Sequence, residues 1–521
     1  MIGGFRKWRA RAGACIFLSL LPGSLGVASP YPHVVVVVWD GMRPDFISEQ
    51  TTPTLAALAR RGVTFRNHHS VFPTATEVNG AAISTGCYPA QSGIIANNEY
   101  RPEIDPLKPI HTETLDAVRK GDELSRGRYM QRSTIAEIVC RTGRKAVVAG
   151  AKPVALLADR EARQAADAGI NVFAGVTLPS NLLPLLTNHY GAFPGETSLD
   201  PSRNDWITSV VLDPLWREEL PHFSFIWMNE PDASQHKTGP GSERSLAALR
   251  SVDQDLARLL QALEAKGALE STDILVVSDH GFSTVSSLVD VAKSLQMAGL
   301  KATREFTSTP ERGEILVVSN SGSVPIYVIG HEESVIRRII SFLQNWEFTG
   351  VIFTRQQFPG TFLLKEARLD SDNAPDILVS LRWSDEKNSN GAPGMIVSDA
   401  SAYGPGQGTH VTLSPFDLHA TLIAAGPHFR SGVVDTLATG NVDIAPTVLW
   451  ILGLHPPTSM DGRVLSEALT IKGPKLRSFE PRHLEAKANL DGSTWMQYLN
   501  VTEINGVRYL DEGNGKQTRE R

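Results

Sequence analysis

The chain has 521 residues, of which 41% are hydrophobic and 20% are charged, and its formal net charge is −6. This length and composition allow a large buried core, and no low-complexity tract or charge block indicates a disordered or fibrous protein. The acidic balance argues against a nucleic-acid-binding surface.

Residues 1–28 have the pattern of a secretory signal peptide. Basic residues at Arg6–Arg11 precede an apolar run at Ala14–Leu21, and Gly26–Ala28 offers a small-residue cleavage site. The apolar run is too short to span a bilayer, although a membrane anchor is the alternative interpretation. We therefore expect a secreted or periplasmic protein with no stable membrane span, and removal of the peptide would leave 46 basic against 56 acidic residues.

Strand-like apolar runs alternate with helical patterns along the chain. His33–Trp39 is an almost unbroken β-branched run, which is typical of a parallel strand buried on both faces. Thr52 as N-cap, Pro53 and Gly62 then frame a short helix. Further core strands are predicted at Lys145–Ala149, Phe223–Met228, Ile274–Val277, Ile315–Val318 and Ile377–Leu381.

A long helix is predicted between two of these strands, because leucines from Leu246 to Leu263 recur at helical spacing and Gly267 follows them. The alternation of strands and helices predicts an α/β fold with a central, mostly parallel sheet flanked by helices. Cys87 and Cys140 could pair if the chain is exported, but each also suits a buried apolar position.

Seven residues have the chemical types expected of a two-zinc hydrolase centred on a threonine. The first six follow strand-like runs or lie at a predicted helix start, where open α/β sheets gather their ligands. Each has an ordinary alternative, such as turn formation at Asp40-Gly41 or capping by Asp279. Together they predict two zinc ions as cofactors and a small-molecule phosphate ester as substrate. The seven are Asp40, Thr76, Asp232, His236, Asp279, His280 and His410.

Thr76 lies at the start of a helix predicted from Thr76 to Gly86. A threonine at this position is usually an N-cap. A helix N-terminus also binds anions, and a metal ion could activate the threonine alcohol as it activates bound water. No general-base histidine would then be needed, so N-cap and nucleophile are both open interpretations.

The spread of these ligands predicts how the chain is divided. Because they extend from residue 40 to residue 410, we expect one catalytic domain at residues 29–470, within which about 285–400 is a candidate inserted subdomain. In the C-terminal tail, residues 471–521, Met496–Leu499 and Val507–Leu510 flank Asn505-Gly506, a signal for a type I′ β-hairpin. We predict disorder for Gly513–Arg521.

Ordered motifs between about residues 33 and 465 resemble the type I phosphodiesterase/nucleotide pyrophosphatase family of the alkaline phosphatase superfamily. They include Asp40–Asp45, Phe72–Asn79, Gly93–Asn97, Glu230–Asp232 and Ser278–Gly281. The resemblance implies an alkaline-phosphatase-like sandwich with a central sheet. It also implies hydrolysis of phosphodiester or pyrophosphate bonds through a phosphothreonine intermediate.

The resemblance also implies a role for each candidate residue. Thr76 rather than Thr74 would be the nucleophile, and Asn97 would hydrogen-bond a phosphoryl oxygen. His419 and His428 compete with His410 for the last ligand position. One zinc would be bound by Asp232, His236 and His410, and the other by Asp40, Asp279 and His280 with the Thr76 oxygen.

Two positions bear on the substrate. Glu77 replaces an aromatic residue that stacks on the base in nucleotide-cleaving relatives, and it would repel an anionic substrate if it pointed inward. Lys152 resembles a lysine that contacts dianionic substrates in related phosphomonoesterases and phosphonoacetate hydrolases, although a solvated loop lysine is the alternative. The competing functions are therefore a phosphomonoesterase or phosphonate hydrolase with the same metals and, from another class, a metal-stapled binding protein without catalysis.

Overall fold

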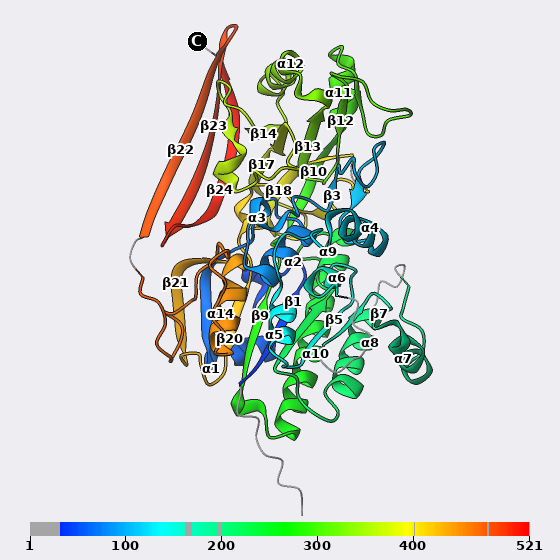
Figure 1. The fold of residues 1–521 in the computed structure, drawn as a ribbon. Helices are drawn as coiled ribbons and strands as arrows, with labels where there is room; N and C mark the ends of the chain where they lie inside the picture. Colours follow the sequence, from blue (N-terminus) through cyan, green and yellow to red (C-terminus); the bar gives the residue numbers. More distant parts are fainter. Residues whose placement is uncertain (1–31, 162–168, 196–200, 401, 477–478, 520–521) are drawn as a thin grey trace, which may run out of the picture. The chain divides into compact units, whose positions relative to one another are not determined.

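The computed structural model describes residues 32–521 except 162–168, 196–200, 401, 477–478 and 520–521, so the predicted signal peptide lies outside the described residues. The largest element of the unit Pro32–Arg521 is a nine-stranded sheet of order β21-β2-β20-β9-β1-β8-β5-β6-β7 (Figure 1). Its strands are β1 (His33–Trp39), β2 (Val63–His69), β5 (Ala146–Gly150), β6 (Gly169–Phe173), β7 (Val176–Leu178), β8 (Phe223–Met228), β9 (Thr272–Val277), β20 (Leu422–Ala425) and β21 (Val433–Gly440).

Strand β1 is the valine run of the sequence and lies at the centre of this sheet. It pairs in parallel with β8 and β9, so that Val36 lies opposite Phe225 and Leu275. The even-numbered valines of β1 enter one apolar cluster and the odd-numbered valines enter another, which buries both faces as predicted. Five of the eight strand pairs are parallel, and the prediction of a mostly parallel sheet is confirmed.

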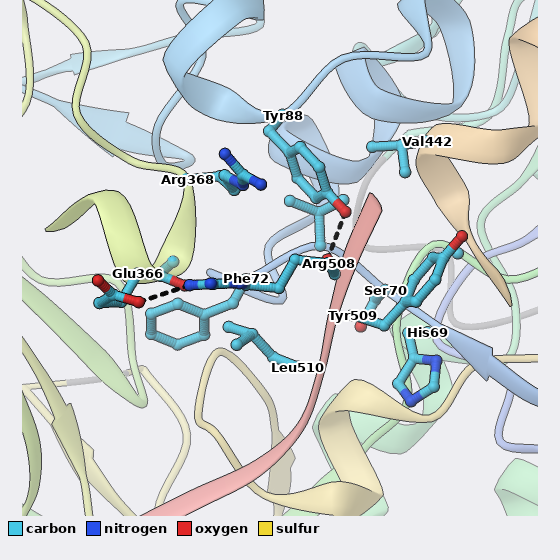
Figure 2. A pocket seen from close by; sticks show the side chains of 13 residues that line it. His69, Ser70, Phe72, Tyr88, Glu366, Arg368, Val442, Arg508, Tyr509 and Leu510 are labelled. Carbon is cyan, nitrogen blue, oxygen red and sulfur yellow. Dashed lines mark hydrogen bonds and ion pairs between the residues drawn. The ribbon is translucent and has the colours of Figure 1, made fainter. Parts of the chain in front are cut away.

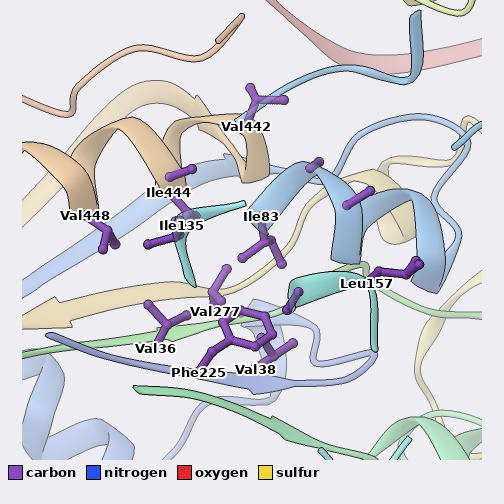
Figure 3. Packing of buried hydrophobic residues seen from close by; sticks show 14 of the residues in the cluster. Val36, Val38, Ile83, Ile135, Leu157, Phe225, Val277, Val442, Ile444 and Val448 are labelled. Atoms are coloured by element: carbon purple, nitrogen blue, oxygen red, sulfur yellow. The ribbon is translucent and has the colours of Figure 1, made fainter. Parts of the chain in front are cut away.

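Helices cover both faces of the nine-stranded sheet. Apolar side chains of four helices pack against β1, β8 and β9 on one face (Figure 3). Because burying one large aliphatic side chain contributes about 1.5–3 kcal/mol, this packing firmly positions the ends of the central strands. The helices on that face are α2 (Thr76–Thr85), α5 (Ile135–Arg141), α6 (Ala155–Ala158) and α14 (Ile444–Ile451), and those on the other are α1 (Pro53–Arg61), α8 (Ser202–Val210) and α10 (Glu243–Ala265).

Helix α1 has the predicted bounds and Thr52 occupies the predicted N-cap position, but its side chain makes no capping hydrogen bond. The Thr52 hydroxyl donates to Ser48 O at 3.2 Å. The N–H groups of Thr54 and Leu55 instead donate to the buried Asp253 carboxylate, each at 2.9 Å. A negative charge from α10 therefore satisfies the N-terminus of α1, which local sequence could not reveal.

Most of the chain between His280 and His410 forms two further sheets. A six-stranded sheet of order β11-β12-β13-β16-β14-β15 packs against α11 (Val291–Met297) and α12 (Glu333–Gln344). A four-stranded sheet has the order β17-β18-β10-β19. Their strands are β10 (Ser283–Val289), β11 (Ala302–Thr303), β12 (Ile315–Val317), β13 (Ser323–Val328), β14 (Thr349–Thr354), β15 (Phe362–Leu363), β16 (Ile377–Leu381), β17 (Trp383–Lys387), β18 (Pro393–Asp399) and β19 (Gly408–Thr409).

The C-terminal segment forms a three-stranded sheet of β22 (Phe479–Leu490), β23 (Ser493–Ile504) and β24 (Val507–Arg519). Asn505 and Gly506 have φ of 53° and 86° in the turn between β23 and β24, which confirms the predicted hairpin. The predicted disorder of Gly513–Arg521 is wrong as far as Arg519, because β24 pairs with β23 over its whole length.

Strand β24 packs closely against the rest of the chain (Figure 2). Arg508 donates to Glu366 at 2.5 Å, and the Tyr88 hydroxyl donates to the Arg508 carbonyl. His69 pairs with Asp511 at 3.0 Å. The cavity between these residues is only about 10 Å³, barely enough for one water.

The described residues bear on two expectations for an exported chain, a disulfide bond and a membrane span. Cys87 and Cys140 are both free thiols, so the alternative of a disulfide is not realised. In the described part of the chain, no helix is long and apolar enough to cross a membrane.

Candidate metal centre

The candidate metal ligands gather at the carboxyl ends of three neighbouring strands. Asp40 follows β1, Asp279 and His280 follow β9, and α9 (Asp232–Thr238) follows β8. Because β8, β1 and β9 are parallel neighbours, their carboxyl ends meet at one edge of the sheet. The helical spacing of Asp232 and His236 places both side chains on one face of α9.

Two groups of side chains hold ligand atoms within 4.8 Å of one another. They are Asp232, His236 and His410, and Asp40, Asp232 and His280. Asp279 lies beside the second group, since its Oδ2 is 3.2 Å from His280 Nε2. The structure therefore brings together all six protein ligands that the sequence predicted, with Asp232 adjoining both groups.

The three histidines all present Nε2 to the centre. Their Nδ1 atoms lie against backbone carbonyls, of Gly408 for His236 at 2.9 Å, Gly281 for His280 at 2.9 Å and Thr74 for His410 at 2.7 Å. A carbonyl oxygen only accepts, so each Nδ1 carries the proton and Nε2 keeps a lone pair in the neutral ring. A hydrogen bond from Nδ1 to a backbone carbonyl orients a histidine ring for metal binding through Nε2.

Three buried carboxylate oxygens have no hydrogen-bond donor among the described residues: Asp40 Oδ1, Asp232 Oδ1 and Asp279 Oδ2. Each faces a histidine Nε2, at 3.5 Å for Asp40 and His280 and at 3.1 Å for Asp232 and His236. Buried lone pairs facing one another are unfavourable unless a cation or a proton lies between them. Carboxylate oxygens and imidazole nitrogens are zinc donors, so these residues fit the metal.

The electrostatics of the centre also favour a bound cation. Burial and the neighbouring Asp279 raise the pKa of Asp40 to about 8, and burial raises the pKa of Asp279 to about 7. Burial and the neighbouring His280 and His236 hold the pKa of His410 well below its usual value. Asp40 and Asp279 therefore resist ionisation, and His410 resists protonation. The centre needs further positive charge to hold ionised carboxylates, and a divalent ion would supply it.

Thr76 lies directly against this centre. It is the first residue of α2, and Ala75 occupies the N-cap position, so the N-cap interpretation of Thr76 is wrong. The Thr76 hydroxyl lies 3.2 Å from His280 Nε2 and the residue is buried. The same hydroxyl lies at the N-terminus of a ten-residue helix, where the free backbone N–H groups favour an anion.

Asn97 is held next to the N-terminus of α2. Its Oδ1 accepts the N–H of Glu77 at 3.2 Å. Because a backbone N–H only donates, this bond fixes the amide orientation and leaves Nδ2 as the donor that can meet a substrate. Asn97 also lines a cavity together with His236 and His410.

Lys152 and Glu77 occupy positions that the sequence did not reveal. Lys152 Nζ lies 2.8 Å from both Asp40 Oδ2 and Asp232 Oδ2, and its side chain is 22% exposed, so it is not a solvated loop lysine. Glu77 is buried, and burial together with Glu113 raises its pKa well above the usual value. A raised pKa favours the neutral carboxyl, which repels a phosphate less than the carboxylate that the sequence suggested.

Two supporting residues were missed by sequence analysis. The Thr74 hydroxyl accepts the N–H of Val411 at 3.0 Å, next to His410. Trp227 Nε1 on β8 donates to Asp40 Oδ2 at 2.8 Å. A buried tryptophan N–H needs an acceptor, but the sequence does not show that Asp40 provides it.

The competing histidines lie elsewhere. His428 pairs with Asp273 at 2.6 Å, and the ring of His419 packs against His69 at 4.8 Å. Neither belongs to a metal-binding group in the described part of the chain. His410 is thus the histidine that the fold brings to the centre.

Comparisons with known proteins give the same family. A family model for type I phosphodiesterase/nucleotide pyrophosphatase matches residues 34–384. The bis(5'-adenosyl)-triphosphatase enpp4 of Xenopus laevis is 21% identical over 444 residues, which cover 84% of this chain and 81% of that protein. The ectonucleotide pyrophosphatase/phosphodiesterase family member 7 of Mus musculus is 21% identical over 450 residues, 85% of this chain and 88% of that protein.

Solved structures agree on the fold. Murine ectonucleotide pyrophosphatase/phosphodiesterase 5 covers 84% of this chain and 100% of its own, with a TM-score of 0.60 at 17% identity. An inactive variant of that murine protein in complex with AMP gives a TM-score of 0.58 at 17% identity. The predicted alkaline-phosphatase-like α/β fold is confirmed.

Carboxylates and imidazoles lie at the strand ends of an α/β sheet, and a phosphodiesterase family model matches most of the chain. Together these findings define a hydrolytic enzyme that acts on phosphoesters. The chain belongs to the type I phosphodiesterase/nucleotide pyrophosphatase family. Members of this family hydrolyse phosphodiester or pyrophosphate bonds, and the resemblance drawn from the sequence motifs is confirmed.

Proposed function

We propose that the chain is an exported two-zinc hydrolase of phosphodiester or pyrophosphate bonds that works through a phosphothreonine at Thr76. The observation that carries the proposal is the set of three unpaired carboxylate oxygens that face histidine Nε2 atoms beside the Thr76 hydroxyl. We assign one zinc to Asp232, His236 and His410, and the other to Asp40, Asp279 and His280.

Zinc bound here would neutralise phosphoryl oxygens and lower the pKa of the Thr76 alcohol. Thr76 Oγ1 would attack phosphorus in line and release its proton to solvent as the new O–P bond forms, while the bond to the leaving oxygen breaks and that oxygen departs with the electron pair. Asn97 Nδ2 would donate to a phosphoryl oxygen, because its Oδ1 is held by the N–H of Glu77. Water would then cleave the phosphothreonine and restore the hydroxyl.

The remaining parts of the proposal rest on separate observations. The signal-peptide pattern of residues 1–28 supports export. The murine relative in complex with AMP supports a small phosphate ester as substrate. The acidic net charge of −6 supports the absence of a nucleic-acid surface.

A second candidate function is hydrolysis of phosphomonoesters or phosphonates with the same metals. Lys152 favours it, because its ammonium group lies 2.8 Å from two carboxylates of the metal centre. A cation so close to the reacting phosphate would favour a dianionic substrate over a monoanionic one.

Zinc content and activity measured together test the proposal. Purified protein should carry about two zinc ions and lose its hydrolysis of bis(p-nitrophenyl) phosphate to a chelator, because six protein ligands form two sets of three. His236→Ala should lower zinc content and activity, whereas the matched control His483→Ala changes an exposed histidine on β22 and should alter neither. Active enzyme with zinc content near zero would contradict the proposal.

A further inference from the structure

A polar cavity adjoins the metal centre. Its volume of about 330 Å³ lies at the lower end for small-molecule sites. His236, His410 and Asn97 contribute to its lining, so an ester whose phosphate is held at the metal centre would place part of its organic group here.

Apart from the two histidines, the residues that line the cavity are uncharged, and several of them are polar. Asn98, Ser319, Asn320 and Ser321 contribute amide and hydroxyl groups, and none of the described residues that line the cavity is lysine or arginine. A pyrophosphate group entering the cavity would bring charge that no cation of the lining compensates. Since the Ser319 hydroxyl donates to Asp399 O and both ends of the Asn320 amide bond to the Asn98 backbone, a hydroxyl of a bound group would meet the Ser321 hydroxyl, which can both donate and accept.

Tyr403, the aromatic residue of the cavity lining apart from the histidines, already stacks on another ring. The Tyr403 ring stacks on the His236 ring at 4.2 Å with an interplanar angle of 15°. The ammonium group of Lys237 lies 5.4 Å from the same tyrosine ring. One face of Tyr403 is therefore covered by a candidate metal ligand, which leaves only its other face for stacking on a nucleobase.

The polar wall is fixed in place before any ligand binds. Asn320 Oδ1 accepts the N–H of Asn98 at 2.8 Å, and Asn320 Nδ2 donates to the Asn98 carbonyl at 2.9 Å. The N–H of Gly322 donates to the His410 carbonyl at 3.2 Å. The turn between β12 and β13 thus clamps the loops that follow Asn97 and His410.

Three non-glycine residues of the lining have left-handed backbone conformations. Ser321, Ala400 and Val411 have φ of 56°, 32° and 81°. Such conformations cost roughly 1–3 kcal/mol each and cluster at functional sites. Three of the eight left-handed non-glycine residues of the described chain therefore lie in the wall of this one cavity.

We propose that this cavity binds a small, uncharged polyhydroxy alcohol group, glyceryl-like or sugar-like, so that the enzyme prefers diesters of such alcohols over nucleotide pyrophosphates. The inference rests on the proposed phosphodiesterase function. The Ser321 hydroxyl, which makes no side-chain hydrogen bond to a described residue, is assigned to a hydroxyl of the substrate.

The test compares kcat/KM for bis(glyceryl) phosphate, diethyl phosphate and ATP by phosphorus NMR. The two diesters carry the same charge and the same type of leaving group, so their ratio reports recognition of the hydroxyls. The glyceryl ester should be preferred over both other substrates. Ser321→Gly, which keeps the left-handed backbone, should lower the glyceryl-to-ethyl ratio about fivefold, the size expected for one neutral hydrogen bond.

The control is Ala174→Gly, which relieves a left-handed residue with φ of 44° in the turn between β6 and β7. It should leave the glyceryl-to-ethyl ratio unchanged. Preference for ATP, a ratio near one, or the same ratio in Ser321→Gly would overturn the inference while leaving phosphodiesterase activity intact. If zinc-loaded protein hydrolyses no diester, the proposed function fails and the inference fails with it.

Discussion

Thr74 and Thr76 lie two positions apart in the sequence but have different surroundings. Thr76 Oγ1 lies 3.2 Å from His280 Nε2, in the metal centre. Thr74 Oγ1 accepts the N–H of Val411, and the Thr74 carbonyl accepts from His410 Nδ1. One hydroxyl is thus placed to react, and the other holds the loop that carries His410.

Alanine substitutions should separate these two roles. Thr76→Ala should abolish turnover and keep the zinc content, since no ligand side chain is lost. Thr74→Ala should keep measurable turnover and lower the free energy of unfolding by about 1–3 kcal/mol, because the buried N–H of Val411 loses its acceptor. Zinc analysis, diester hydrolysis and urea unfolding of both variants check this. Turnover that survives in Thr76→Ala but not in Thr74→Ala would assign the nucleophile to Thr74.

Lys152 lies where it can act on the substrate or on the ligands. Lys152→Ala should lower kcat/KM for p-nitrophenyl phosphate more than for bis(p-nitrophenyl) phosphate, by a factor on the order of ten, because the monoester carries more negative charge. Lys145→Ala, which removes a lysine paired with Glu219 at the surface, is the matched control. Equal losses on both substrates would mean that Lys152 only holds Asp40 and Asp232 in position.

At the scale of the element, sequence patterns predicted those features that depend on neighbouring residues. The valine run gave β1, the leucine spacing gave α10, and Asn505-Gly506 gave the hairpin, because strand, helix and turn preferences are local. The cap of α1 by Asp253 was missed, because that carboxylate comes from another helix.

The same distinction applies to the candidate site. Asp40, Asp279 and the pair on α9 could be placed because they follow strands that the sequence reveals. His410 could be assigned only through the family resemblance, since it follows the two-residue strand β19 after two further sheets. The contacts of Lys152 and Thr74 depend on side chains meeting across the fold, which no local pattern specifies.

Strand β24 provides the prediction at this scale, because the sequence predicted disorder for the end of the chain that it occupies. A Cβ at Gly515 would lie 2.1 Å from Gly350 O and 2.6 Å from the Trp495 ring. Gly515→Ala should therefore force the C-terminal sheet away from β14 and lower the free energy of unfolding by about 1–3 kcal/mol. In Gly195→Ala the added Cβ meets no atom of the described residues within 4 Å, so the urea midpoint should change far less. Equal midpoints for the two variants would show that this backbone contact is not needed.

Across the whole molecule, parts that are distant in sequence converge on the loop after His410. The N–H of Gly513 on β24 donates to Leu413 O at 3.0 Å. The Ser323 hydroxyl, at the start of β13, donates to Val411 O at 2.5 Å. The C-terminal sheet and the six-stranded sheet therefore both support the loop that carries His410, and we expect their stability to be coupled to the candidate metal centre.

This coupling predicts how stability depends on pH with and without zinc. In the metal-free fold the pKa of Asp40 is raised from 3.8 to about 8 and that of Asp279 from 3.8 to about 7. Between pH 3.8 and about pH 7 or 8, each carboxyl keeps a proton in the folded state that it has released in the unfolded state. These two groups therefore lower the stability of the metal-free protein as pH rises. Zinc requires deprotonated ligands and binds the folded state, so its stabilisation grows over the same range.

The expected outcome is that the difference in Tm between zinc-loaded and chelator-treated protein increases from about pH 5 to about pH 8. Subtracting the two melting curves at each pH cancels groups that titrate outside the centre. Asp279→Asn removes one of the two raised carboxyls and should flatten the increase, whereas Asp385→Asn, an exposed residue of β17, should leave it unchanged. A Tm difference that is constant or falls with pH would mean that the carboxylates of the centre do not bind the metal.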